Sequence, residues 1–297
     1  MKILEVSNIC KNFGNLKAVD NISFSIEEGI IFGALGPNGA GKTTTIRMIM
    51  NIIMPDSGDI SIMGVSNLKE NNNLIGYLPE ERGIYRKMKV EEVLMFFSKL
   101  KSMPRQEAKE KIQYWLERFE LLDWRKKKVE ELSKGMQQKL QFIATIMYDP
   151  KLLILDEPFL GLDPVNSNLL KDVLLEMKQK GITIIFSTHQ MESAEKLCDE
   201  IILINKGRSV LAGDLKSIKS SAGKHHIQLE YNGNNNFLTT SDKIKKYDDF
   251  GQYVEVELHK EVDPQSFLKE IVPQIEIKRF EIIEPSLNDI FIETVKD

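Results

Sequence analysis

One short segment, GPNGAGKTTT at residues 36–45, constrains the fold more than any other part of the sequence. It fits the pattern G-x-x-x-x-G-K-[ST], and it lies between an apolar run at residues 30–35 and a segment with helical composition, IRMIMNII. In that context successive backbone N–H groups and the helix N-terminus bind phosphate. The segment therefore predicts a nucleotide-phosphate site in an α/β core.

The predicted phosphate loop supplies the first group of candidate nucleotide-binding residues. We expect Lys42 to place a positive charge near the β- and γ-phosphates of ATP and the Thr43 hydroxyl to bind Mg²⁺. The alternative is a glycine turn that contains a lysine by chance, which the flanking strand and helix disfavour. The candidates are Gly36, Pro37, Asn38, Gly39, Ala40, Gly41, Lys42, Thr43 and Thr44.

Two later apolar strands are expected to end beside this loop. The run LLIL delivers Asp156 and Glu157, of which Asp156 can hold Mg²⁺ and Glu157 can polarise the water that attacks the γ-phosphate. The next strand ends in Ser-Thr-His and places the His189 imidazole at the same sheet edge. Taken alone, the carboxylate pair is also compatible with a solvated loop, and the histidine with a structural role.

The hydrophobic pattern divides the chain into regions. Residues 1–65 alternate like half-buried antiparallel strands, and residues 90–148 have helical spacing with almost no glycine. We predict an α/β fold with a phosphate-loop core, an N-terminal antiparallel β subdomain and an inserted helical subdomain, together forming a domain at residues 1–214. Residues 215–297 are predicted to form a small, acidic α+β accessory domain, with a turn at Asp248 and Asp249.

Charge and hydropathy exclude two functional classes. With 40 Lys and Arg against 44 Asp and Glu, the net charge of −4 leaves no basic surplus for a dedicated nucleic-acid binder, so no nucleic-acid partner is expected. The longest run without charged residues is residues 29–41, which is shorter than the roughly 20 apolar residues of a membrane span. The N-terminal sequence MKILEVSNIC lacks the apolar core of a signal peptide, so we expect a cytoplasmic protein.

A further motif, LSKGMQQK at residues 132–139, identifies a family. It resembles the signature motif of ATP-binding-cassette ATPases, LSGGQ in its commonest form. The order of motifs also matches that family: glycine loop, LSKGMQQK, LILDEP, GLD and STH. The resemblance covers residues 1–214.

The resemblance implies a head-to-tail dimer with each ATP held between the glycine loop of one subunit and the signature of the other. By this resemblance, Ser133 and Gly135 contact the γ-phosphate of the opposite subunit's ATP, and Asp163 crosses the dimer interface. His189 is the switch histidine. Phe13 is expected to stack on adenine, although a core phenylalanine is nearly as compatible with its position.

Two positions depart from the family pattern. Glu80 stands where most members have a glutamine, and we keep it as a candidate contact to Mg²⁺ or the attacking water. Leu160 replaces the small serine or threonine that usually precedes GLD, which puts the hydrogen bonding of that loop in doubt.

The segments GYLPEERGIYRKM and EPSLNDIFIETV resemble ATPase subunits of bacterial and archaeal sodium, drug or antibiotic exporters. This implies an ATP-hydrolysing subunit, peripheral on the inner face of the membrane, with an integral membrane permease docked on residues 81–89. Two alternatives are a soluble, translation-associated cassette ATPase and a module that no longer hydrolyses ATP. The basic run at residues 125–128 is interpreted as a solvated helix end rather than a lipid contact.

Overall fold

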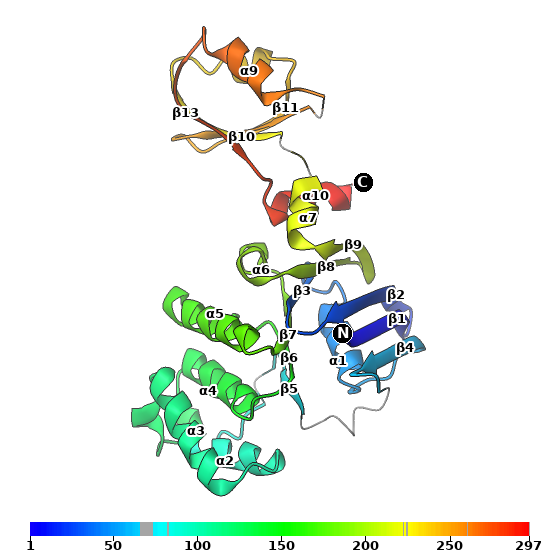
Figure 1. Ribbon diagram of the computed structural model, residues 1–297, viewed down its shortest axis with the longest axis vertical. Helices are drawn as coiled ribbons and strands as arrows, with labels where there is room; N and C mark the ends of the chain where they lie inside the picture. Colours follow the sequence, from blue (N-terminus) through cyan, green and yellow to red (C-terminus); the bar gives the residue numbers. More distant parts are fainter. Residues whose placement is uncertain (66–73, 82, 222, 224, 260, 297) are drawn as a thin grey trace. The chain divides into compact units, whose positions relative to one another are not determined.

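The computed structural model describes residues 1–65, 74–81, 83–221, 223, 225–259 and 261–296. The chain divides into two compact units, Met1–Gly213 and Asp214–Asp297 (Figure 1). No helix in these ranges is long and apolar enough to cross a membrane.

The centre of unit 1 is a six-stranded, largely parallel sheet that carries the glycine loop (Figure 1). Strands β3, β6 and β7 pair in parallel, and every residue in them is buried, which explains their almost continuous apolar sequences. The order across the sheet is β5 (Ile75–Leu78), β6 (Leu152–Asp156), β7 (Thr183–Thr188), β3 (Ile31–Leu35), β8 (Glu200–Asn205) and β9 (Arg208–Asp214).

A second, three-stranded sheet forms the N-terminal β subdomain. Strand β1 (Lys2–Phe13) lies between β2 (Leu16–Glu27) and β4 (Ser57–Ile62), antiparallel to both. Its buried residues include Leu4, Val6 and Ile9, and they join one hydrophobic core with residues of the parallel sheet. The predicted half-buried antiparallel subdomain is confirmed.

The helices of unit 1 either follow single strands or form an insert between two strands. Helix α1 (Lys42–Ile49) follows the glycine loop, while α5 (Pro164–Gln179) and α6 (Met191–Leu197) follow β6 and β7. The helical insert between β5 and β6 comprises α2 (Val90–Leu100), α3 (Arg105–Arg118), the short helices η3 (Leu122–Trp124) and η4 (Val129–Glu131), and α4 (Lys134–Ile146).

Unit 2 is an antiparallel sheet covered on one face by an apolar core that includes Phe237 and Phe267. The strand order is β11 (Ile244–Asp249), β12 (Val254–Leu258), β10 (His226–Asn232) and β13 (Glu276–Ile283). The helices are α7 (Leu215–Ser221), α8 (Phe237–Thr240), α9 (Pro264–Ile271) and α10 (Leu287–Lys296). The predicted fold class is therefore confirmed, but the predicted turn at Asp248 and Asp249 is wrong, because both residues end the edge strand β11 and pair with β12.

Candidate nucleotide site

The glycine loop joins β3 to α1 and passes against two other chain segments. At Gly36, with φ +146°, an added Cβ would lie 2.1 Å from the Ile204 carbonyl oxygen. At Gly41, with φ +109°, it would lie 2.5 Å from the Ala18 carbonyl oxygen. Only glycine fits at these two positions, so the spacing of glycines in the motif follows from the backbone path.

Lys42 and Thr43 begin helix α1 and connect the loop to the strand ends. The buried Lys42 ammonium donates to Gly36 O at 2.8 Å and lies 3.7 Å from Glu157 Oε1. The Thr43 hydroxyl donates to Asp156 Oδ1 at 3.2 Å and lies 3.5 Å from Glu80 Oε2. Residues from three separate motifs therefore meet within hydrogen-bonding or ion-pairing distance.

Asp156, fully buried at the end of β6, is the group best placed to bind a cation. Its Oδ1 accepts hydrogen bonds from Thr43 and from the Ser187 hydroxyl, while its Oδ2 is buried with no hydrogen-bond partner among the described residues. Burial raises the pKa of this carboxyl, and the nearby Glu80 and Glu157 carboxylates raise it further. A cation at Oδ2 would supply the missing partner.

Glu157 adopts a left-handed backbone conformation, with φ 49°, immediately after β6. Its N–H lies 3.1 Å from Ser187 Oγ, to which it donates, and its Oε1 lies 3.0 Å from His189 Nδ1. The serine hydroxyl thus contacts both acidic residues, and the histidine ring contacts the second one. Ser187 lies in the predicted Ser-Thr-His run, but no local sequence pattern indicates its role.

A cleft of about 660 Å³ opens over the loop and extends to the end of β1. Phe13 lies in its wall with 50% of its surface exposed, so the alternative of a core phenylalanine is wrong. The cleft is lined by Phe13, Leu16, Lys17, Ala18, Asn38, Gly39, Ala40, Gly41, Lys42, Thr43, Thr44, Glu80, Glu157, Lys206 and Gly207. Sequence analysis missed Leu16, Lys17, Ala18, Lys206 and Gly207.

The signature residues form a different surface, and Ser133, Gly135 and Asp163 do not line this cleft. Ser133 is the N-cap of α4 and accepts a hydrogen bond from the Met136 N–H at 3.2 Å. Asp163 caps α5 in the same way, accepting from the Asn166 N–H at 2.9 Å. The two helix starts are joined, because Lys139 of α4 donates to the Asn166 side chain at 3.1 Å.

The two departures from the family pattern occupy different surroundings. Glu80 follows β5 in the cleft wall, near Thr43, so a carboxylate stands beside the expected cation position. Leu160 is 42% exposed in the loop before α5, and its N–H donates to Glu157 O at 3.1 Å. Its apolar side chain therefore adds exposed surface close to Asp163.

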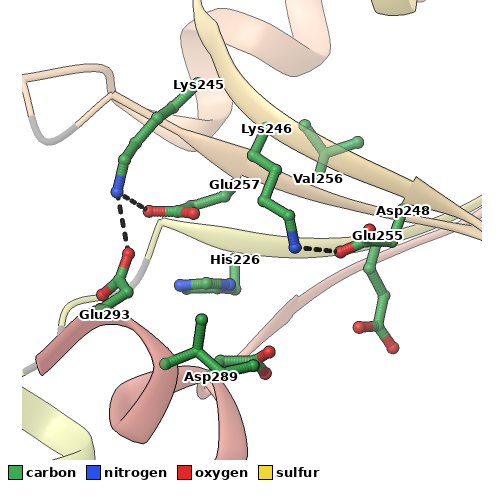
Figure 2. Close-up of a pocket in the computed structure, with 10 residues that line it drawn as sticks. His226, Lys245, Lys246, Asp248, Glu255, Val256, Glu257, Asp289 and Glu293 are labelled. Atoms are coloured by element: carbon green, nitrogen blue, oxygen red, sulfur yellow. Dashed lines mark hydrogen bonds and ion pairs between the residues drawn. The ribbon is translucent and has the colours of Figure 1, made fainter. Parts of the chain in front are cut away.

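Unit 2 contains a separate charged pocket, shown in Figure 2, between the sheet and α10. Lys245 bridges Glu257 and Glu293, and Lys246 pairs with Asp248. His226 lies half-buried among these groups. No group of three or more His, Cys, Asp or Glu residues in the described ranges could hold a metal ion.

Comparisons with known proteins agree with this geometry. A family model described as ABC transporter matches residues 19–160, and one described as ATP-binding protein DrrA1-3-like, C-terminal domain, matches residues 213–295. A third model, described as AAA domain, putative AbiEii toxin, Type IV TA system, matches residues 127–195 within unit 1.

Individual relatives extend over almost the whole chain. The ABC transporter ATP-binding protein YhaQ of Bacillus subtilis is 44% identical over 99% of this chain and 98% of its own. The linearmycin resistance ATP-binding protein LnrL of the same organism is 34% identical over 98% of this chain and 97% of its own. A solved structure titled "Structure of ATP binding subunit of ABC transporter" is 31% identical, with a TM-score of 0.69, over 74% of this chain and 93% of that one.

The glycine loop, the buried Asp156 and the parallel sheet define a phosphate-loop ATPase of the ATP-binding-cassette class. The chain belongs to the ABC transporter ATP-binding family. It is the ATP-binding, ATP-hydrolysing subunit that energises a transporter complex with membrane partners. The predicted family and function are confirmed, and the alternatives of a translation-associated ATPase and a non-hydrolysing module are not supported.

Proposed function

We propose that the chain hydrolyses Mg²⁺-ATP at the cleft of unit 1 and so drives export through a separate permease. The observation that carries this proposal is the convergence of Lys42, Thr43, Asp156, Glu157 and His189 around the glycine loop. Lys42 would pair with the β- and γ-phosphate oxygens, and the loop N–H groups would bind the remaining charge.

The donor set around Asp156 fits a hard divalent cation. Thr43 Oγ1, the unpartnered Asp156 Oδ2 and the Glu80 carboxylate are oxygen ligands of the kind that Mg²⁺ prefers. When bound, Mg²⁺ would neutralise charge on the phosphates. Glu157 Oε1 would accept a proton from the attacking water, and His189 would orient the Glu157 carboxylate.

The arrangement of the signature residues supports a homodimer. Ser133 and Gly135 offer a hydroxyl and an N–H group at the start of α4, on a surface that does not line their own chain's cleft. In a head-to-tail dimer they would contact the γ-phosphate held by the other subunit. Asp163, tied to α4 through Asn166 and Lys139, would lie at the same interface, and exposed Phe13 would stack on adenine.

The permease is proposed to dock on the helical insert, which places the subunit at the inner face of the membrane. A groove of about 500 Å³ there combines apolar and charged side chains: Met88, Met95, Phe96 and Ile112 with Glu91, Glu92, Lys99, Arg105, Lys109 and Arg125. Tyr85 packs edge-on against Phe96 and is 52% exposed, so about half of its surface is open to a partner. Arg82, also in the predicted docking segment, lies outside the described residues. Export as the direction follows relatives such as a Nod factor export ATP-binding protein, 37% identical over 71% of this chain and 70% of its own.

Affinity purification from membranes tests the proposal. The tagged chain should retain an integral membrane protein with several hydrophobic segments and should hydrolyse ATP only when Mg²⁺ is present. Lys42→Ala should keep the membrane partner but lose ATP binding, whereas Lys151→Ala, an exposed lysine outside the cleft, should keep both. Recovery of ribosomes or nucleic acid in place of a membrane protein would contradict the proposal.

A further inference from the structure

Two segments that are far apart in the sequence lie side by side in the helical insert. A backbone bridge pairs Lys89 with Lys128, and the Val129 N–H donates to Met88 O at 3.0 Å. The sequences RKMK, at residues 86–89, and RKKK, at residues 125–128, are thereby combined on one surface. We name their cations the basic patch: Arg86, Lys87, Lys89, Arg125, Lys126, Lys127 and Lys128.

The basic patch contains more cations than ion-paired glutamates. Four glutamates pair with four of its members: Glu91 with Arg125 at 2.6 Å, Glu130 with Lys128 at 3.6 Å, Glu131 with Lys127 at 3.7 Å and Glu92 with Lys89 at 4.0 Å. The last three pairs are exposed and long, so they bind weakly.

Three cations of the patch are unneutralised. Arg86, Lys87 and Lys126 are exposed and form no ion pair with any residue that the structure describes. Two further basic residues, Arg105 and Lys109, line the adjoining groove together with Arg125. A chain with net charge −4 therefore concentrates positive charge on one part of its helical insert.

We propose that the basic patch binds the anionic headgroups of a phospholipid bilayer. Screening at physiological salt acts over about 8 Å, so the local patch and not the net charge of the chain decides the interaction. Clusters of four to eight Lys and Arg bind anionic membranes in this way, with about 1 kcal/mol, or about five-fold in affinity, for each cation.

An acidic protein segment is the competing partner, but the geometry favours lipid. Recognition of a defined carboxylate uses donors held in fixed geometry, such as a bidentate arginine. The three cations without ion pairs are held by no partner in the described part of the chain, and mobile headgroups require no fixed arrangement. Residues 86–89 belong to the segment proposed for permease docking, so the inference rests on that face lying at the membrane; vesicles without a permease separate lipid binding from permease docking.

Vesicle sedimentation of the full chain tests the proposal. The probes are vesicles of phosphatidylcholine alone and vesicles in which about 30% of the lipid is phosphatidylglycerol, at about 0.15 M salt. The patch variant combines Arg86→Gln, Lys87→Gln and Lys126→Gln. The matched control combines Lys216→Gln, Lys269→Gln and Lys278→Gln, which removes the same charge from exposed lysines of unit 2 that pair with no described residue.

The wild type and the control should bind the anionic vesicles, and the patch variant should bind them on the order of 100-fold more weakly. The melting temperature of the patch variant should match that of the wild type, which shows that the variant is folded. Equal binding to both kinds of vesicle, or an equal loss in the control, would overturn the proposal. Capture by soluble poly-glutamate without vesicle binding would assign the patch to an acidic protein segment instead.

Discussion

Ser187 is a single buried hydroxyl that fixes two acidic residues at once. It donates to Asp156 Oδ1 and accepts from the Glu157 N–H, so it ties the end of β7 to the end of β6. Ser187→Ala would leave both of those groups without this partner. Partners that orient metal ligands typically contribute 10–100-fold in activity or metal affinity.

We therefore expect Ser187→Ala to lower kcat by about 10–100-fold and to raise the Mg²⁺ concentration needed for half-maximal hydrolysis. ATP binding measured without Mg²⁺ should not change, because Ser187 contacts neither the loop nor Lys42. Ser193→Ala removes a similarly buried hydroxyl on α6, outside the cleft, and should leave kcat unchanged. A loss of stability without any change in kcat or Mg²⁺ requirement would show that Ser187 is only structural.

The buried Asp156 carboxylate is expected to reduce stability in exchange for cation binding. Its pKa is raised by burial, so folding disfavours the charged form. The destabilisation is complete above the folded pKa and disappears as the pH falls below the unfolded value of 3.8. Asp156→Asn should thus raise the melting temperature in EDTA at neutral pH by about 2–4 °C, for a gain of about 1 kcal/mol, and abolish hydrolysis.

Thermal denaturation at a series of pH values measures this effect. The difference between Asp156→Asn and the wild type should shrink as the pH is lowered toward 4, because the wild-type carboxyl becomes protonated. Asp163→Asn serves as the comparison, since hydrogen bonds from Asn166 lower the pKa of that exposed carboxyl. A melting temperature of Asp156→Asn at or below the wild-type value would contradict the expected cost of the buried charge.

The site residues that belong to a local sequence motif could be predicted from the sequence. The residues that only tertiary packing brings to the cleft could not. Lys42, Asp156 and Glu157 were predicted because their spacing from glycines or from an apolar strand is local. Lys206 and Gly207 reach the cleft only because the turn after β8 packs against β2, where the Gly207 carbonyl oxygen accepts from the Asp20 N–H at 2.8 Å. No spacing in the sequence encodes that contact.

At the level of elements, a substitution at the start of α4 can test the proposed function without changing the stability of the fold. A Cβ added at Gly135 would meet Gly161 O at 3.8 Å and Leu162 at 3.9 Å, which are ordinary contacts, and its φ is not positive. Gly135→Ala should therefore keep the melting temperature and ATP binding. If the N–H groups here contact a γ-phosphate across the dimer, the added methyl should reduce hydrolysis by about 100-fold.

Steady-state hydrolysis and equilibrium ATP binding, measured on the same preparations, test Gly135→Ala. Gly83→Ala is the control, because an added Cβ there meets no atom within 4 Å and its φ is not positive. It should hydrolyse ATP at the wild-type rate. Wild-type hydrolysis by Gly135→Ala would remove this residue from the proposed dimer site.

The elements predicted most accurately are those with strong hydrophobic periodicity. Strands β3, β6 and β7 have nearly continuous apolar sequences because helices and strands cover both faces. The edge strand β11, IKKYDD, is mostly exposed, so no alternation marks it and its last two residues were interpreted as a turn. Charged side chains on an edge strand hinder its pairing with other chains, which gives a physical reason for the charged sequence of β11.

On the scale of the whole molecule, net charge is a poor guide to local surfaces. The counts of acidic and basic residues excluded a nucleic-acid binder, but they could not reveal that residues 86–89 and 125–128 pair on one surface. The basic run at residues 125–128 alone was compatible with a solvated helix end. Its pairing with a second run follows from how η4 packs beside the start of α2, which is a property of the folded insert.

The arrangement of unit 1 has a consequence for the number of copies in the active form. A single chain presents its cleft and its Ser133–Gly135 surface separately, so a γ-phosphate bound at Lys42 lacks the signature donors. In the proposed head-to-tail dimer, two copies would satisfy both sites, and hydrolysis would then remove the γ-phosphate that joins them. Glu157→Gln keeps the size of the side chain but removes the proposed base, so the dimer should persist.

Size-exclusion chromatography with light scattering measures this outcome. Glu157→Gln in Mg²⁺-ATP should elute with twice the 34.1 kDa mass of the chain and should return to 34.1 kDa in EDTA. Adding Lys42→Ala or Gly135→Ala to Glu157→Gln should keep the protein monomeric, because each removes one half of the composite site. Dimers of the double variants would show that the contact between subunits does not depend on bound nucleotide. A Glu157→Gln variant that stayed monomeric in Mg²⁺-ATP would show that the signature surface has another partner.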